Sequence, residues 1–331
     1  MEHLSRRAAQ PRSALRVAVP PPPGGETRLL SLDAAARFLA ARYGARAGAL
    51  APLGAGCWSR AYAFTLDGQE MVARFGPDGA DFAKDQIMGG FRSGRLPIPR
   101  VLEVGEAPEG FFAVSERVHG VLLDDLDAAG MRAVLPSLLT ALAAASEINA
   151  WDGKGYGGWG PDGVAPCKTW REAVLAFAGD RLGGWRATLA GSPTGDGPLA
   201  TGLVRLQELA ADLPDVPQVI HGDLLHRNVL VHGAEVTGIF DWGNSMVGDA
   251  LYDAAWLLFW WPWYPAWTSI DIRAELDRHW AARGDVPRDL EHRLHCYQVR
   301  IGLEHLAWYA FTRRWGDLER CAQQTLALAA R

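Results

Sequence analysis

The sequence predicts an α+β protein with two lobes, a small β-rich N-terminal lobe and a larger, mainly helical C-terminal lobe. Residues 53–118 contain runs of β-branched and aromatic residues separated by Gly and Pro, which is typical of strands joined by turns. Residues 132–149 and 290–330 are instead helix-length stretches rich in Ala and Leu. Between them, residues 218–240 return to short apolar runs around a Gly turn, which predicts a strand hairpin.

The chain divides into three parts by composition. Residues 1–27 are rich in Arg, Ala and Pro, and we expect a mobile leader there. Residues 28–117 are expected to form the N-terminal lobe and residues 118–331 the C-terminal lobe. The first helix is predicted to start after Ser31, a residue type that caps helices, and to stop near Gly44.

Composition excludes several classes of protein. A net charge of −5 argues against nucleic acid as the main partner, because such proteins present a basic face. The four cysteines are far apart, without a C-x-x-C pair, and predict free thiols in a reducing cytoplasm. Neither a signal peptide nor a run of about eighteen apolar residues is visible. We therefore expect a cytoplasmic monomer without a membrane or nucleic-acid partner.

Polar residues gather where the strands of residues 218–240 end. His221, Asp223 and Asn228 lie on the first loop, and Asp241 directly follows the last strand. Phosphoryl transfer needs such a set: one carboxylate to orient a hydroxyl and accept its proton, and an Asn and a second Asp to hold Mg²⁺. Asp, Asn and His are also ordinary turn residues, so His221–Asp223 alone would decide little.

The spacing of this set identifies a family. The kinase pattern is H-x-D, an Asn five residues later, and Asp-aromatic-Gly after a strand. Here HGDLLHRN followed by IFDWG resembles the aminoglycoside phosphotransferase family of small-molecule kinases. LPIPRVLEVGE, TWREAVLAFA, FWWPW and RIGLEHL are similar to the hygromycin B branch of that family.

The resemblance implies a protein-kinase-like fold, ATP or GTP and Mg²⁺ as cofactors, and an aminoglycoside hydroxyl of hygromycin B type as the acceptor. It implies that Asp223 is the catalytic base and that Asn228 and Asp241 hold the metal. His221 is expected to brace the loop through hydrogen bonds. Asp249 is expected to cap the next helix and support the catalytic loop.

The nucleotide is expected to contact the N-terminal lobe. Gly54, Gly56 and Ser59 lie in a glycine-containing loop between predicted strands, although Gly-x-Gly is often only a turn. Glu116 and Val118 belong to the link between the lobes, and the backbone of this link is expected to meet the adenine edge.

Arg74 stands on a predicted strand where the family usually has a phosphate-binding lysine, and none of the three lysines lies on that strand. Arg is always charged and can donate two hydrogen bonds to phosphate oxygens, so the role can survive the change. The alternative is an exposed strand arginine. Asp85, or Asp81 one turn earlier, is expected to pair with Arg74, unless both are solvated helix residues.

Five residues are candidates for acceptor binding, because aromatic faces and carboxylates suit a polycationic sugar. They are Asp162, Trp159, Asn244, Trp263 and Glu304. Each has a structural alternative: Trp159 and the tryptophans of residues 256–267 can pack in the core, and Glu304 can form a surface ion pair.

Three other functions compete with an aminoglycoside kinase. A macrolide, choline or sugar kinase would share every catalytic residue. A pseudokinase that only binds nucleotide is favoured by Arg74 alone. A protein kinase is disfavoured, because Leu225 stands where protein kinases commonly have Lys and no Ala-Pro-Glu segment follows Asp241.

Overall fold

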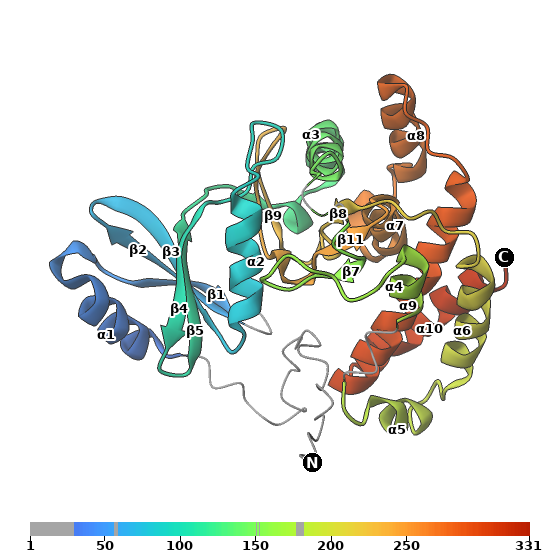
Figure 1. Cartoon of the computed structure of the whole chain (residues 1–331), viewed down its shortest axis with the longest axis horizontal. Helices are drawn as coiled ribbons and strands as arrows, with labels where there is room; N and C mark the ends of the chain where they lie inside the picture. The colour runs from blue at the N-terminus through green and yellow to red at the C-terminus, as the bar shows by residue number, and fades with distance from the viewer. Residues whose placement is uncertain (1–29, 56–58, 150, 152, 177–181) are drawn as a thin grey trace, which may run out of the picture.

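The computed structural model describes residues 30–55, 59–149, 151, 153–176 and 182–331. Within them, an N-terminal β-sheet region and a C-terminal helical region lie side by side (Figure 1). This arrangement confirms the predicted α+β class and its order along the chain. The predictions for residues 1–27, Gly56 and Cys57 lie outside the described residues. The predicted division between residues 117 and 118 falls between β5 and β6, and as a boundary of folding units it stays a prediction.

The N-terminal sheet has five antiparallel strands in the order β1-β2-β3-β5-β4. They are β1 Ala51–Ala55, β2 Arg60–Leu66, β3 Gln69–Gly76, β4 Val101–Ala107 and β5 Gly110–Glu116. The β2–β3 turn is tight because Asp67 and Gly68 both adopt positive φ, at 52° and 80°. Two consecutive left-handed residues match the twist of antiparallel strands, so this hairpin fixes the register of β3.

The two faces of β3 serve different purposes. Ala73 and Phe75 are buried under α1 (Leu32–Tyr43) in the core of the sheet, whereas Arg74 points to the opposite face. That face carries α2 (Gly79–Gly89), which packs against β4 and β5. Alternation along the strand therefore directs Arg74 toward α2.

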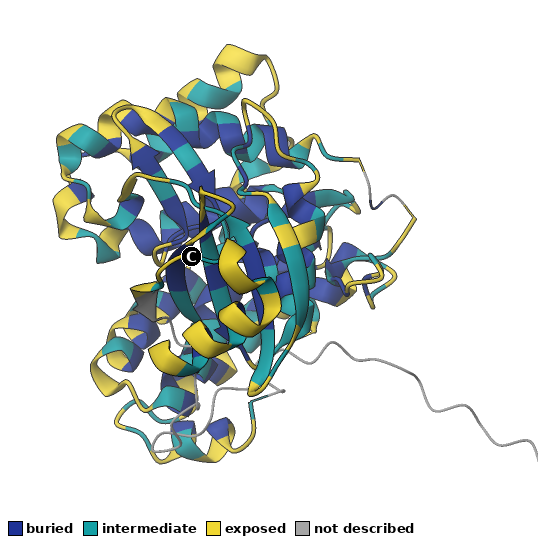
Figure 2. Ribbon diagram, turned by 90° about the vertical axis from the view of Figure 1, so that its left-hand side faces the viewer, coloured by how far each residue is buried: buried dark blue, intermediate teal, exposed yellow. Residues whose placement is uncertain are grey.

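The helix α1 forms as predicted. The Ser31 hydroxyl accepts a hydrogen bond from the Ala34 N–H, and Gly44 ends the helix with a φ of 59°. Viewed from the side of the N-terminal sheet, a helix with an exposed outer surface covers strands of buried and intermediate residues (Figure 2).

Two small sheets at the start of the helical region carry the predicted catalytic segment. Their orders are β10-β9-β6 and β7-β11-β8. Their strands are β6 Val121–Leu122, β7 Gly157–Gly158, β8 Gln218–Ile220, β9 Val229–His232, β10 Glu235–Ile239 and β11 Met246–Gly248. The predicted hairpin is thus β9–β10, turning at Gly233, and the polar loop lies between β8 and β9.

Helices form the rest of this region. The α-helices are α3 Ala128–Ser146, α4 Trp170–Leu175, α5 Trp185–Ala190, α6 Gly197–Leu209, α7 Leu251–Trp260, α8 Ile272–Arg283, α9 Leu290–Thr312 and α10 Trp315–Ala329. Short 3₁₀ turns are η1 Gly44–Arg46, η2 Leu123–Asp125, η4 Trp242–Asn244, η5 Trp261–Trp263 and η6 Pro265–Trp267. Contacts of α9 with α5, α6, α7 and α10 make it the central helix of the region.

One described helix, α3, is long and apolar enough to cross a membrane by length and composition. Met131, Val134 and Leu138 on α3 are fully buried, and the helix packs against β8 and β10. Its apolar character is that of a core helix. The buried cysteines Cys296 and Cys321 are free thiols as predicted.

Candidate active site

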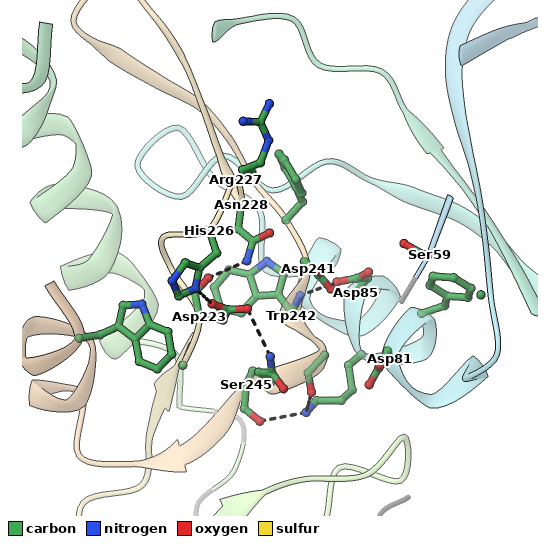
Figure 3. A pocket seen from close by; sticks show the side chains of 18 of the residues that line it. Ser59, Asp81, Asp85, Asp223, His226, Arg227, Asn228, Asp241, Trp242 and Ser245 are labelled. Carbon is green, nitrogen blue, oxygen red and sulfur yellow. Dashed lines mark hydrogen bonds and ion pairs between the residues drawn. The ribbon is translucent and has the colours of Figure 1, made fainter. Parts of the chain in front are cut away.

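A cleft of about 1680 Å³ lies between the sheet and the helical region. It is lined by most of the residues predicted for the site: Ser59, Arg74, Asp85, Glu116, Val118, Asp223, Asn228, Asp241, Asn244, Trp263 and Glu304. Figure 3 shows several of them converging from the β8–β9 loop, the segment after β10, and α2. Elements far apart in the sequence thus build one site.

The loop after β8 is shaped by glycine and held by His221. Gly222 has a φ of 75°, and a Cβ atom there would lie 2.8 Å from the Asn244 carbonyl oxygen, so only glycine fits. The buried His221 ring accepts the Asp223 N–H at Nδ1 (3.2 Å) and donates from Nε2 to the Phe240 carbonyl (3.1 Å). It thereby ties the β8–β9 loop to the end of β10, as the predicted bracing role requires.

Asp253 is a second anchor of this loop, and sequence reasoning missed it. Its buried carboxylate accepts the N–H groups of His221 (2.8 Å) and Gly222 (2.9 Å). Burial raises the pKa of Asp253, while its electrostatic interaction with His221 and these two hydrogen bonds oppose the shift. The sequence did contain a sign of this role, because Asp253 is an acidic residue inside the otherwise apolar helix α7.

Asp249 supports a different part of the molecule from the one predicted. Its buried carboxylate accepts the Leu251 N–H (3.1 Å), two hydrogen bonds from Arg293 (both 2.7 Å) and one from Tyr297 (2.6 Å). Asp249 therefore caps α7, as predicted, and joins it to α9. The expectation that it holds the catalytic loop is wrong, because that contact belongs to Asp253.

The side chain of Asp223 is oriented from two sides. Its Oδ1 accepts a hydrogen bond from His226 Nδ1 at 2.8 Å, and its Oδ2 lies 3.4 Å from the Asn244 amide nitrogen. Both contacts are visible in Figure 3. The side chain is 22% exposed and lines the cleft, so a carboxylate oxygen remains available to a molecule bound there.

Asn228 and Asp241 present oxygen donors toward the same part of the cleft (Figure 3). The Asn228 amide nitrogen donates to the Asp223 carbonyl oxygen (2.7 Å), which leaves its amide oxygen for a ligand. Among the described residues no group of three or more His, Cys, Asp and Glu side chains could hold a metal ion alone. Mg²⁺ needs only one or two protein oxygens when phosphates supply others, so this donor set fits it.

The electrostatics of Asp241 also suit a cation. Its carboxylate is open to the cleft, yet loss of bulk water around it raises its pKa to about 7. The Arg74 charge opposes the shift, whereas the charges of Asp85 and Asp223 add to it. The backbone at Asp241 is left-handed, with a φ of 66°, a conformation that costs roughly 1–3 kcal/mol in a residue other than glycine.

Arg74 pairs with Asp85 and not with Asp81. The second oxygen of Asp85 accepts the Trp242 N–H at 2.7 Å, so this carboxylate joins β3, α2 and the segment that follows Asp241. The Arg74 side chain is only 15% exposed, so the alternative of an exposed strand arginine is wrong. Burial would lower the pKa of Arg74, but Asp85 and Asp241 raise it overall, which keeps it a cation.

Lys84 makes a further contact between α2 and the segment that follows Asp241, and sequence reasoning did not assign it. Its buried Nζ donates to the carbonyls of Gly243 (2.6 Å) and Ser245 (2.9 Å). Burial lowers the pKa of Lys84 to about 8, with the Asp81 charge opposing the shift. A Cβ at Gly243 would lie 2.8 Å from Asp81 Cγ, which shows how closely α2 packs here.

Aromatic residues and a few charged groups, Glu304 among them, form the other half of the cleft. Trp263 and Tyr309 stack with ring centroids 6.0 Å apart, and Trp263 donates to Gln324 (2.7 Å). Glu304 is paired with the buried Arg300 at 2.6 Å and still lines the cleft, so it is not in a surface ion pair. Of the remaining tryptophans of residues 256–267, all are largely buried: Trp256, Trp260, Trp261 and Trp267.

Two predicted acceptor residues do not line this cleft. Trp159 is completely buried, with its ring 4.8 Å from the Trp151 ring and under Lys84 Nζ, so it cannot stack on a ligand. Asp162 is exposed and its carboxylate accepts the Val164 N–H (3.1 Å) within its own turn. Both predictions are wrong: the loop reaches the cleft through Gly157 and Gly158, while Trp159 packs into the core and Asp162 is exposed within its own turn.

The predicted nucleotide-binding backbone is only partly within the described residues. Gly54 lies in β1, and Ser59 lines the cleft just before β2. Glu116 ends β5 with its side chain turned to Arg92 (2.8 Å), which is consistent with a contribution from main-chain groups only. Val118 lines the cleft in the link that follows.

The sequence profile of the phosphotransferase enzyme family (APH) matches residues 49–292, from just before β1 into α9. The chain belongs to this family. Hygromycin-B 4-O-kinase from Escherichia coli is 33% identical over 250 residues, which cover 75% of this chain and 71% of that protein. The phosphotransferase is thus similar to a curated kinase over most of both lengths.

Solved structures give the same result for the fold. Aminoglycoside phosphotransferase APH(4)-Ia superposes with a TM-score of 0.79 at 29% identity, covering 91% of this chain and 99% of that one. A thermostable mutant of it, in a ternary complex with AMP-PNP and hygromycin B, gives a TM-score of 0.77 at 30% identity and covers 89% and 97%. The predicted protein-kinase-like fold of this phosphotransferase is therefore confirmed.

Proposed function

We propose that this phosphotransferase transfers the γ-phosphoryl group of ATP, or of GTP, to a hydroxyl of an aminoglycoside of hygromycin B type. The observation that carries the proposal is the single cleft that Asp223, Asn228 and Asp241 share with aromatic residues such as Trp263. The similarity to hygromycin-B 4-O-kinase and to the ternary complex with AMP-PNP and hygromycin B supports this acceptor.

The nucleotide would occupy the half of the cleft beside the sheet. Backbone groups of Glu116 and Val118 would meet the adenine edge, and Gly54 and Ser59 would approach the phosphates. Arg74, held in place by Asp85, would offer its guanidinium to two phosphate oxygens.

Asp223 would orient the acceptor hydroxyl through Oδ2, since Oδ1 is engaged by His226. The acceptor O–H bond breaks as its proton passes to Asp223, and the acceptor oxygen forms a bond to the γ-phosphorus. The bond between this phosphorus and the bridging oxygen of ADP breaks, and ADP leaves. A positioned base of this kind is worth about 10²–10⁴ in rate.

Asn228 and Asp241 would hold Mg²⁺, which when bound neutralises phosphate charge and fixes the position of the phosphates. The protein's own part is to keep these two oxygens aimed at the cleft. It does so through the hydrogen bond from Asn228 to the Asp223 carbonyl and the contacts of Lys84 and Asp85 with the segment after Asp241.

The acceptor would bind against the aromatic half. Ring faces of Trp263 and Tyr309 suit stacking on sugar rings, and Glu304 suits an ammonium group. Asn244, beside Asp223, would contact the acceptor near the hydroxyl that reacts. We further propose that the enzyme acts as a monomer in the cytoplasm.

Acceptor-dependent ADP release tests this function. The purified protein is incubated with Mg²⁺ and ATP or GTP, and with hygromycin B, other aminoglycosides, a macrolide, choline or a simple sugar. We expect ADP release with hygromycin B and a product that has gained one phosphoryl group by mass spectrometry. Asp223→Asn serves as the inactive control.

The other outcomes discriminate between the rival functions. Release with choline, a sugar or a macrolide, but with no aminoglycoside, would replace the acceptor while keeping the kinase chemistry. Nucleotide binding without ADP release for any acceptor would identify a pseudokinase and reject the proposal.

A further inference from the structure

We propose that His226 is a positioning residue that holds the base Asp223 in its productive orientation and links it to the acceptor wall. The inference rests on the proposed function, in which Asp223 accepts the proton of the acceptor. His226 lies three residues after Asp223 on the same loop and points at it from the cleft side (Figure 3).

The hydrogen bond has one possible direction. An ionised carboxylate can only accept, so His226 Nδ1 must carry the proton that bridges the 2.8 Å to Asp223 Oδ1. This bond occupies one oxygen and fixes the rotation of the carboxyl group. Among the described residues, the other oxygen, Oδ2, has only the 3.4 Å contact with Asn244, and it is the one left for the acceptor hydroxyl.

The His226 ring is itself held in place by aromatic neighbours. It meets the Trp260 ring edge to face at a centroid distance of 4.8 Å and the Trp256 ring at 5.8 Å. The His305 ring lies beyond, at 6.4 Å. These rings belong to α7 and α9, which also line the cleft, so the wall that would hold the acceptor also sets the place of the imidazole.

A carboxylate that is distant in the sequence holds the backbone conformation at His226. His226 and Arg227 adopt φ values of 66° and 74°, a left-handed conformation that most residues avoid. Asp124 accepts both of their N–H groups at 3.0 Å and also the Tyr264 hydroxyl at 2.7 Å. Tyr264 lines the cleft, so Asp124 connects the cleft wall to the turn that aims His226 at Asp223.

Two substitutions separate the hydrogen bond from the ring and the backbone. His226→Asn and His226→Gly both remove the ring, and both residue types tolerate positive φ. Only Asn keeps an N–H donor near the position of Nδ1. We expect His226→Gly to lower kcat by about 10- to 100-fold with the KM for ATP unchanged, because small misplacements of a reacting group cost rates of this size. His226→Asn should recover most of the lost kcat.

The outcomes are separable. Wild-type kcat in His226→Gly, or equal losses in His226→Asn and His226→Gly, would overturn the inference while leaving the kinase function intact. A wild-type protein inert toward every acceptor would reject the proposed function and this inference with it. If His226→Gly does not fold, His226→Gln replaces it: its amide reaches past the Nδ1 position, so it should show the low kcat, and wild-type activity would overturn the inference.

Discussion

The two halves of the cleft are built in different ways. On the sheet side, two buried cations have specific partners: Arg74 pairs with Asp85, and Lys84 donates to two carbonyls of the segment after Asp241. On the helical side, aromatic rings such as Trp263 and Tyr309 dominate, and Glu304 with its partner Arg300 supplies the charge at α9. One half is an ionic framework and the other is a shaped apolar wall.

This difference reflects what each half would bind. Phosphate transfer demands fixed charges at fixed positions, and preorganised groups in a partly dry site act strongly without rearranging. A sugar presents ring faces and scattered polar groups, for which aromatic surfaces and few charges suffice. Substitutions on the sheet side should therefore affect turnover, whereas those on the helical side should affect acceptor affinity.

The largest effect on turnover is expected at Asp223, where the two halves of the cleft meet. Asp223→Asn removes the proton acceptor but preserves shape, so kcat should fall by about 10³-fold or more. Nucleotide affinity, measured by fluorescence or calorimetry, should be unchanged. Near-normal turnover in a folded variant would mean that another group receives the proton.

The next largest effect is expected for Asn228 and Asp241, the two proposed metal ligands. Asp241→Asn should lower kcat by about 10²-fold at ordinary Mg²⁺, because the γ-phosphate would be misplaced. Titrating Mg²⁺ should show that the variant needs a higher concentration for half-maximal rate. Chelation of Mg²⁺ with EDTA should stop the wild-type enzyme. An unchanged Mg²⁺ requirement would contradict the assignment of Asp241.

Two substitutions of Arg74 test whether the charge or the geometry of this side chain is needed for phosphate binding on the sheet side. Arg74→Met removes the cation and should lower kcat/KM for ATP by about 10²-fold. Arg74→Lys keeps the charge but loses the fork of donors, so its loss should be smaller. If Met and Lys behave alike, the planar guanidinium, and not its charge, is what the phosphates need.

Glu304→Gln probes the helical side. Loss of one negative charge facing a cationic acceptor should raise the acceptor KM by roughly 10-fold, equivalent to about 1.4 kcal/mol. The KM for ATP should not change, because Glu304 lies on the helical side of the cleft. Steady-state kinetics with each substrate varied in turn would measure both constants. A rise in both KM values would contradict the division of the cleft into two halves.

The smallest effect is expected outside both halves, at Glu147. Hydrogen bonds from Arg95 and then Arg283 lower the pKa of Glu147 from 4.5 to about 2. A lowered folded-state pKa stabilises the fold above about pH 4.5, and this contribution is lost as the pH falls toward 2. Because the pair is exposed, Glu147→Gln should cost less than about 1 kcal/mol of unfolding free energy at neutral pH.

Urea unfolding of wild type and Glu147→Gln near neutral pH and at about pH 3 would measure this difference, which should shrink in acid. The kinetic constants of Glu147→Gln serve as the control and should match wild type. A change in either KM would show that residues remote from the cleft also determine binding.

The sequence predicted the ionic framework better than the aromatic wall. Asp223, Asn228 and Asp241 were found because their spacing along one hairpin determines where they lie. The choice between Asp81 and Asp85 was left open, because one turn of α2 separates them and only the packing of α2 on β3 decides which faces Arg74.

Contacts between distant segments account for the errors. Trp159 was predicted at the acceptor because aromatic faces suit a sugar, but Trp151 and Lys84 cover its ring. Asp253 was overlooked although an acid within an apolar helix is a visible signal. The role of His226 depends on Asp124, about a hundred residues earlier in the chain, and no local pattern reveals such a pairing.

Helix α7 carries a constraint on how this enzyme can change. Tyr252, Trp256 and Trp260 line the cleft from one stripe of the helix, while Asp253, one position along, grips the backbone of the catalytic loop. Any rotation or sliding of α7 that reshaped the pocket would also displace the loop after β8, because Asp253 binds the backbone of that loop. Evolution or engineering would therefore have to adapt the pocket to a new acceptor by replacing side chains on α7, without moving the helix.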